Sequence, residues 1–169
     1  PAKLNLFLHI VGRRTDGYHL LQSVFQLIDW CDIVTLKAIP ENEVRRINPL
    51  PGVSPEQDLV VRAARLLKDF CKFEGGVEIS LQKEIPMGAG LGGGSSDAAF
   101  TLMGLRDLFQ LPLTNEDLQP YAAKLGSDCA FFLSNQAAFG KGKGDVLSPI
   151  DASLKGKFLV LLYPAVGIS

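Results

Sequence analysis

The stretch that decides the fold is PMGAGLGGGSSDAA, residues 86–99, in which five of the seven residues at positions 88–94 are glycine. Glycine has no Cβ, so successive backbone N–H groups can approach phosphate oxygens closely. An alternating apolar segment precedes this stretch and a helical pattern follows it, and a helix start adds N–H donors and a partial positive charge. The sequence therefore predicts a phosphate-binding loop between a strand and a helix.

Other glycine-rich loops fit the sequence less well. GAGLGG matches the GxGxxG of dinucleotide folds, but the acidic residue expected on a second strand would be Asp107, which lies in a helical pattern. A Walker A loop needs Lys after its last glycine, whereas Ser95 follows Gly94. A protein-kinase loop should be followed by VAIK and HRD segments, and neither occurs. A plain flexible turn seldom holds so many glycines between a strand and a helix.

Composition and charge narrow the function classes. The 169 residues, 47% of them hydrophobic, suit one compact core. A net charge of -1 offers no field for nucleic acid or an anionic membrane, and no apolar run is long enough to span a bilayer. The three cysteines are far apart, which fits neither a zinc site nor a disulfide framework. We expect a cytoplasmic protein, or a plastid one if its source bears plastids.

The apolar periodicity mixes strands and helices without regular βαβ alternation, which indicates an α+β fold. The expected strands cover residues 4–10, 20–28, 33–38, 44–47, 77–81 and 158–163, with a Gly-rich hairpin at residues 141–145 and a short apolar segment at residues 129–133. Helices are expected to start at Ser54, with Pro55 and Gln57 as start signals, directly after the glycine loop, and near Thr114. Pro120 is expected to kink or shorten the last of these helices.

Four motifs in order resemble those of the GHMP kinases: PAKLNL at residues 1–6, GRRTDGYH at 12–19, the glycine loop, and LGSDCAFF at 125–132. The resemblance implies an amino-terminal ATP-binding domain over residues 1–163, with a mixed or antiparallel sheet packed with helices, like domain 2 of ribosomal protein S5. It also implies that residues 164–169 begin the connection to a carboxyl-terminal domain that is absent from this chain.

The resemblance further implies ATP-dependent phosphorylation of a small-molecule alcohol with Mg²⁺. Asp128 is the implied general base, and Lys3 the cation that polarises the hydroxyl and counters the γ-phosphate charge. Without the family, Asp128 could cap the segment that follows it, and Lys3 could be a solvated strand end. No metal ligand is assigned. The implied ATP-binding residues are Pro86, Met87, Gly88, Ala89, Gly90, Leu91, Gly92, Gly93, Gly94, Ser95 and Ser96.

Within the family, PAKLNL and DGYH are most similar to members that phosphorylate the 2-hydroxyl of 4-diphosphocytidyl-2-C-methyl-D-erythritol, an alcohol linked to cytidine diphosphate in non-mevalonate isoprenoid synthesis. Asn5, Tyr18 and His19 are the implied substrate-binding residues, although Asn5 could equally bond a neighbouring loop and the other two could be turn packing. The alternatives are another GHMP alcohol kinase and a non-catalytic nucleotide-binding module. The roles of Asp58 and Asp97 and the oligomeric state stay open.

Overall fold

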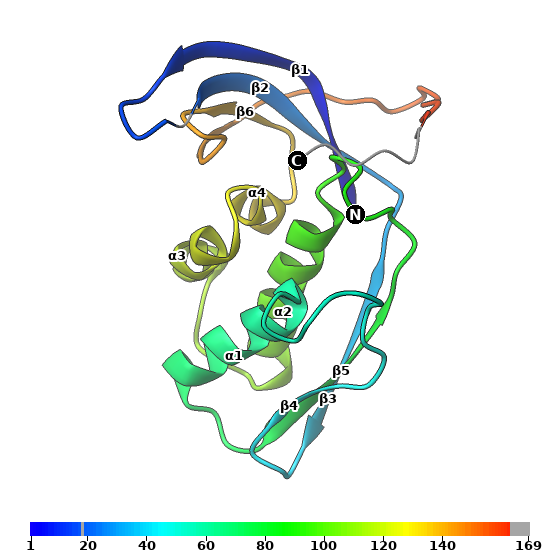
Figure 1. Ribbon diagram of the computed structural model, residues 1–169, viewed down its shortest axis with the longest axis vertical. Coiled ribbons are helices and arrows are strands. Elements are labelled where there is room, and N and C mark those ends of the chain that lie inside the picture. Colours follow the sequence, from blue (N-terminus) through cyan, green and yellow to red (C-terminus); the bar gives the residue numbers. More distant parts are fainter. Residues whose placement is uncertain (18, 163–169) are drawn as a thin grey trace.

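Two β-sheets and four helices make up the computed structural model, which describes residues 1–17 and 19–162. Figure 1 shows one sheet across the top of the view, the helices below it, and the second sheet along their lower right side. The helices are α1 (Leu59–Cys71), α2 (Gly93–Leu108), α3 (Asn115–Leu125) and α4 (Cys129–Ser134). This arrangement confirms the predicted α+β class.

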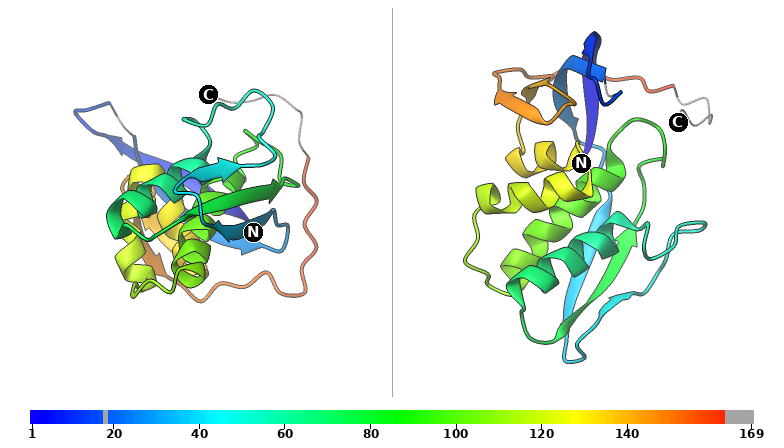
Figure 2. Two further views of the ribbon diagram at one scale, coloured as in Figure 1. Left: turned by 90° about the horizontal axis from the view of Figure 1, so that it is seen from below. Right: turned by 60° about the vertical axis from the view of Figure 1, so that its left-hand side comes forward.

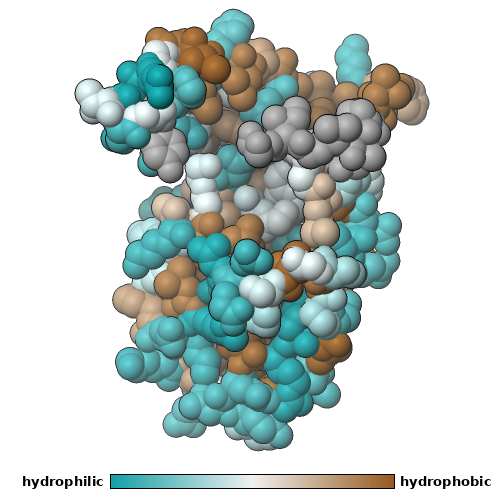
Figure 3. Space-filling view, viewed as in Figure 1, coloured by the Kyte–Doolittle hydropathy of each residue, from teal (hydrophilic) through white to brown (hydrophobic). Residues whose placement is uncertain are grey.

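The first sheet is antiparallel throughout. Its order is β1 (Ala2–Arg13), β2 (His19–Ile28), β6 (Ala138–Lys141) and β7 (Val146–Pro149), and the last two strands form the expected Gly-rich hairpin. On β1, Leu8 and Ile10 are 52% and 63% exposed, while Lys3 is buried. At the start of β1 the side that carries Lys3 therefore faces inward. Figure 3 shows apolar residues at the surface over this sheet.

The second sheet delivers the chain into the glycine loop. Its order is β3 (Ile33–Ile39), β5 (Gly76–Gln82) and β4 (Val44–Arg46), with β5 antiparallel to β3 and parallel to β4. Val77, Ile79 and Leu81 alternate along β5 and are all buried, as the sequence predicts. Helices α1 and α2 pack on this sheet, which Figure 2 shows from two further directions.

Two sequence predictions about the helices need correction, and one segment left open is now assigned. The first helix does not start at Ser54, because Asp58 is its N-cap and accepts a hydrogen bond from the Val60 N–H at 3.0 Å. Pro120 does not shorten α3, which runs on to Leu125 because its inner side is buried. The short segment at residues 129–133 is helix α4. Within the described ranges, no helix has the length and hydropathy needed to cross a bilayer.

The strand predicted at residues 158–163 is wrong over its described part. Residues 158–162 carry no strand, and Phe158 is 99% exposed. Apolar residues alone do not make a strand, since the backbone also needs a neighbouring strand with which to pair. Tyr163 and the expected connection at residues 164–169 lie outside the described residues, so the domain division stays a prediction.

Gly76 at the start of β5 has no room for a side chain. A Cβ there would lie 2.0 Å from the Glu43 carbonyl oxygen and 2.3 Å from that of Glu41, and backbone atoms cannot rotate away. We expect Gly76→Ala to lower the free energy of unfolding by about 3 kcal/mol or more. Gly104→Ala is the matched control. Its Cβ would meet only the side chain of Leu36, nearest at Cδ1, 2.7 Å away, which can rotate, and alanine favours the helix. Urea denaturation should separate the two variants, and equal losses would contradict this account.

Candidate functional site

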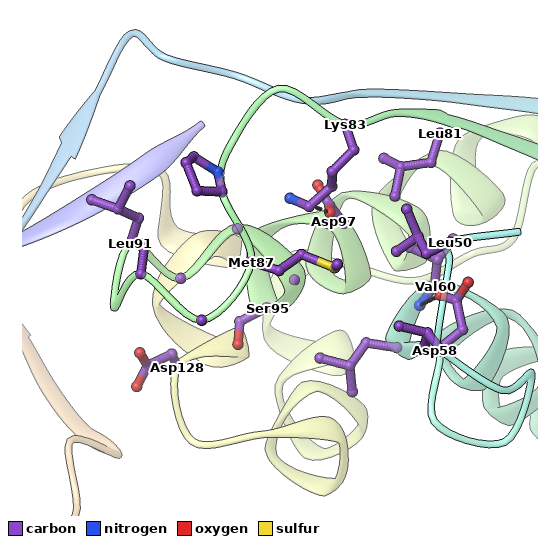
Figure 4. Close-up of a pocket in the computed structure, with 18 of the residues that line it drawn as sticks. Leu50, Asp58, Val60, Leu81, Lys83, Met87, Leu91, Ser95, Asp97 and Asp128 are labelled. Atoms are coloured by element: carbon purple, nitrogen blue, oxygen red, sulfur yellow. Dashed lines mark hydrogen bonds and ion pairs between the residues drawn. The ribbon is translucent and has the colours of Figure 1, made fainter. Parts of the chain in front are cut away.

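The glycine loop, α1 and β5 enclose a cavity of about 450 Å³. It is lined by ten of the eleven residues predicted to bind ATP, from Pro86 to Ser95, and by Lys3 and Asp128. Ser96 is not among them, because it is buried and faces a different hollow, beside Cys31 and Asp32. Figure 4 shows Asp128 and Leu91 at one end of the cavity, and Leu50 and Leu81 at the other.

The loop is held open by its glycines. Gly88, Gly90 and Gly92 adopt φ angles of 71°, 73° and 69°, in the left-handed region that other residues rarely adopt. A Cβ on Gly92 would also lie 2.9 Å from the Phe132 ring and 3.0 Å from Lys3 Cγ. The Lys3 N–H donates to the Leu91 carbonyl at 2.9 Å. The loop and β1 are therefore fixed to each other at the position of Lys3.

The start of α2 faces the cavity with its backbone donors. Gly92 is the N-cap of α2, and no side chain caps the helix. The first N–H groups of a helix have no carbonyl partner within the helix. No acidic residue occupies the first turn of α2, and Asp97 lies one turn further on. These donors and the helix dipole suit an anion such as a phosphate.

Lys3 and Asp128 form an ion pair at the edge of the cavity. Lys3 Nζ lies 3.3 Å from Asp128 Oδ2, with the Lys3 side chain 7% exposed and that of Asp128 30% exposed. The lysine is thus no solvated strand end. Asp128 takes the N-cap position of α4 but makes no side-chain capping bond, so capping does not account for it. A carboxylate open to the cavity beside a buried ammonium can accept a proton from a hydroxyl placed there.

Asn5 and His19, two of the predicted substrate-binding residues, do not line the cavity that contains Lys3 and Asp128. Asn5 instead bonds the side chains of Lys3 and Ser23. His19 lines a second cavity of about 780 Å³, together with Ser127, the neighbour of Asp128. Tyr18 lies outside the described residues, so its predicted role stays a prediction.

Sequence reasoning missed a buried charge cluster behind the glycine loop. Lys83 pairs with Asp32 and lies 3.3 Å from Asp97. Asp32 also accepts hydrogen bonds from the backbone N–H groups of Glu84 and Ile85, at 2.6 and 2.8 Å. A signal was present: Lys83 continues the phase of the buried β5 residues, and a charge in a buried phase requires partners.

The two carboxyl groups of the cluster differ in pKa. Burial, with repulsion from Asp32 and only partly opposed by attraction to Lys83, raises the pKa of Asp97 to about 7. Burial also acts on Asp32, but the hydrogen bonds from Lys83, Ile85 and Glu84 outweigh it and lower the pKa of Asp32. Lys83 therefore stabilises the charge of Asp32 more than that of Asp97. The Lys83–Asp97 contact, which Figure 4 shows, is the weaker of the two ion pairs of Lys83.

Asp58, whose role the sequence left open, has a structural role in α1. Besides capping that helix, it pairs with Arg46 Nε at 3.1 Å, and both side chains are 6% exposed. Asp58 also lines the cavity, together with Val60 and Leu81. Across residues 1–17 and 19–162, no group of three or more His, Cys, Asp or Glu side chains could hold a metal ion.

Known proteins are similar to this chain in sequence and in fold. Residues 58–143 match the family model described as the GHMP kinases N terminal domain. The chain is 66% identical over its whole length to 4-diphosphocytidyl-2-C-methyl-D-erythritol kinase of Polynucleobacter necessarius, and covers 56% of that protein. It is 52% identical over 99% of its length to the enzyme of that name from Thiobacillus denitrificans, and covers 60% of it. The chain thus spans little more than half the length of these curated relatives.

Solved structures agree with these matches. A crystal structure of 4-(cytidine 5'-diphospho)-2C-methyl-D-erythritol kinase superposes with a TM-score of 0.79 at 39% identity, over 89% of this chain and 53% of that one. Homoserine kinase from Cytophaga hutchinsonii superposes with a TM-score of 0.62 at 22% identity, over 78% of this chain and 45% of that one. The second likeness concerns the fold alone.

The raised pKa of Asp97 makes a prediction about stability. A group whose pKa is higher in the folded state contributes stability that is complete below its unfolded value, 3.8, and is lost as the pH rises through about 7. We expect Asp97→Asn to remove this loss. The variant should gain on the order of 1–2 kcal/mol relative to the parent between pH 5 and pH 8.

Thermal denaturation of the full-length protein and the variant, at one-unit pH steps, measures this difference. Asp107→Asn, which changes an exposed carboxylate of the same helix, is the matched control. A parent-to-variant difference that stays constant with pH would show that Asp97 is already charged at pH 5.

Proposed function

The chain belongs to the GHMP kinase family, and on this premise we propose that the full-length protein transfers the γ-phosphate of ATP to the 2-hydroxyl of 4-diphosphocytidyl-2-C-methyl-D-erythritol. The products are ADP and the 2-phosphate of that alcohol. The names of the bacterial relatives and of the solved structure at 39% identity support this substrate. This chain supplies the nucleotide-binding half of such an enzyme.

The cavity supports one orientation of ATP. Its apolar end, where Leu50, Val60 and Leu81 gather, suits the adenine base (Figure 4). The glycine loop and the start of α2 present backbone donors to the phosphates. The γ-phosphate then lies toward the opposite end, beside Lys3 and Asp128.

The observation that carries the proposal is the Lys3–Asp128 pair at that end. Phosphoryl transfer depends on positioning, on stabilising charge and on a group that accepts the hydroxyl proton. Asp128, partly exposed to the cavity, accepts the proton of the substrate hydroxyl. Lys3 lies 3.3 Å away, so its ammonium stabilises the negative charge on the attacking oxygen and on the γ-phosphate.

The second cavity supports a site for the cytidine part of the substrate. His19 contributes an imidazole that can donate to or accept from the polar edge of a base. Ser127 lines the same cavity, and the next residue, Asp128, lines the ATP cavity. A substrate bound in the second cavity therefore brings its hydroxyl to the proposed base. Tyr18, expected to stack on the cytosine ring, completes this proposal.

Magnesium accompanies ATP in this proposal. Mg²⁺ in kinases is held mainly by phosphate oxygens and water, with one or two protein ligands, so it needs no cluster of three carboxylates. Ser95 lines the cavity inside the first turn of α2 and has a hydroxyl for such a contact. Asp97 also lines the cavity, but its carboxylate is paired with Lys83. The expected cytoplasmic location and lack of nucleic-acid or membrane partners stay predictions.

The test is ADP release by the full-length protein given Mg-ATP and 4-diphosphocytidyl-2-C-methyl-D-erythritol. We expect turnover in the parent and a loss of at least about 100-fold in kcat for Asp128→Asn, because the amide cannot accept the proton. Asp107→Asn, which changes an exposed carboxylate of α2 that lines neither cavity, tests whether the loss is specific. ATP binding without turnover on any alcohol would favour a non-catalytic nucleotide-binding module.

Substrate recognition has its own test. His19→Ala should raise the KM for the cytidine alcohol about tenfold with a smaller effect on kcat, as expected when a hydrogen bond made equally in the ground and transition states is lost. His9→Ala is the matched control, because His9 is exposed on β1 and lines neither cavity. An unchanged KM in His19→Ala, with turnover intact, would show that His19 does not bind the substrate.

A further inference from the structure

A chain of polar contacts leads from the proposed catalytic pair into the first sheet. Lys3 Nζ, 3.3 Å from Asp128, also donates to Asn5 Oδ1 at 2.5 Å. Asn5 Nδ2 donates to Ser23 Oγ at 2.6 Å. Ser23 Oγ donates in turn to the Phe7 carbonyl oxygen at 2.6 Å. Four side chains from β1, β2 and the segment before α4 are thereby joined end to end.

The chemistry of the last contact fixes the direction of all the others. A carbonyl oxygen can only accept, so the single proton of the Ser23 hydroxyl is directed to Phe7. The hydroxyl is then left with lone pairs and can only accept from Asn5. The NH₂ group of the Asn5 side chain must face Ser23, and its oxygen must face Lys3. Lys3 can only donate, so Lys3 and Ser23 require the same orientation of the Asn5 amide, and Ser23 holds the end of it that Lys3 does not contact.

A β-bulge supplies the carbonyl at the end of this chain. Asn5 is opposite Phe25 and Leu8 is opposite Ser23, so three steps along β1 correspond to two along β2. The additional residue interrupts the regular pairing of the two strands. The Phe7 carbonyl lies in this irregular stretch and accepts from a side chain, Ser23, of the neighbouring strand.

Ser23 is remote from both cavities. It is fully buried, lines neither the ATP cavity nor the second cavity, and pairs through its backbone with Gly140 of β6. Any effect of its hydroxyl on phosphoryl transfer must therefore pass through Asn5 and Lys3. A buried serine can also be purely structural, and a decisive experiment must distinguish the two roles.

We infer that Ser23 is a positioning residue for the phosphoryl transfer: through Asn5 it presents an amide oxygen to Lys3 and holds the Lys3 ammonium beside Asp128 and the γ-phosphate. This inference rests on the proposed function. It also changes the role of Asn5, which acts on Lys3 and not on the substrate. Without the Ser23 hydroxyl, the Asn5 NH₂ group loses its acceptor. Only Lys3 then holds the amide, so the position of the amide oxygen beside the ammonium is less well defined.

Steady-state kinetics of the full-length protein tests this. Ser23→Ala should lower kcat about fivefold to tenfold, the usual size for the loss of one hydrogen bond, and leave the KM for ATP within about twofold. Ser23→Thr keeps the hydroxyl and should keep kcat within about twofold of the parent. Ser148→Ala, on the exposed surface of β7 in the same sheet, is the control for serine removal and should match the parent.

A double-mutant cycle with Asn5→Ala separates positioning from structure. If Ser23 acts through Asn5, adding Ser23→Ala to Asn5→Ala should change kcat by less than about twofold. Full multiplication of the two losses would overturn the inference, as would a Ser23→Ala kcat equal to that of Ser148→Ala. Ser23→Cys, similar in shape but a weak donor, replaces the alanine variant if that protein does not fold. Absence of turnover in the parent contradicts the proposed function instead.

Discussion

The burial of Lys3 against the glycine loop is the constraint on which the rest of the site depends. Its ammonium is compensated by Asp128 and Asn5, and its backbone N–H is bonded to the Leu91 carbonyl. A buried ammonium is costly unless such partners are present. Gly92 has to lack a side chain because Lys3 and Phe132 already occupy that space. Strand, loop and α4 are thus held in one arrangement.

A second lysine, Lys83, is largely enclosed and holds the other side of the loop. Lys83 joins the end of β5 to Asp32, which follows β2, and to Asp97 on α2. A Cβ on Gly93 would lie 2.8 Å from its ammonium, so the first turn of α2 packs directly on this cluster. The glycine loop, flexible by composition, is therefore fixed between two compensated lysines. Such preorganisation aligns backbone donors before a phosphate arrives.

Several elements could be predicted from periodicity and local signals because their causes are local. Val77, Ile79 and Leu81 alternate because one side of β5 is buried, and Thr114 starts α3 with a capping box. Ser54 was misleading for the same reason. Ser54 begins a turn, and helix α1 starts only after Asp58. The Asp58 carboxylate caps α1 and also pairs with Arg46 of β4, which is distant in the sequence. Local helix propensity does not include the tertiary ion pair between Asp58 and Arg46.

The sequence by itself determined the α+β class, the phosphate loop and its following helix, and, by motif, the pairing of Lys3 with Asp128. Glycine content, period-two alternation and motif order are properties of neighbouring residues, so they can be recognised without coordinates. Only the tertiary structure decided that Asn5 bonds Lys3 and Ser23, that Ser96 is buried away from the cavity, and that Asp32 and Asp97 share Lys83. These contacts join residues from separate elements, and the direction of a hydrogen bond depends on which donor and acceptor the packed chain brings within reach.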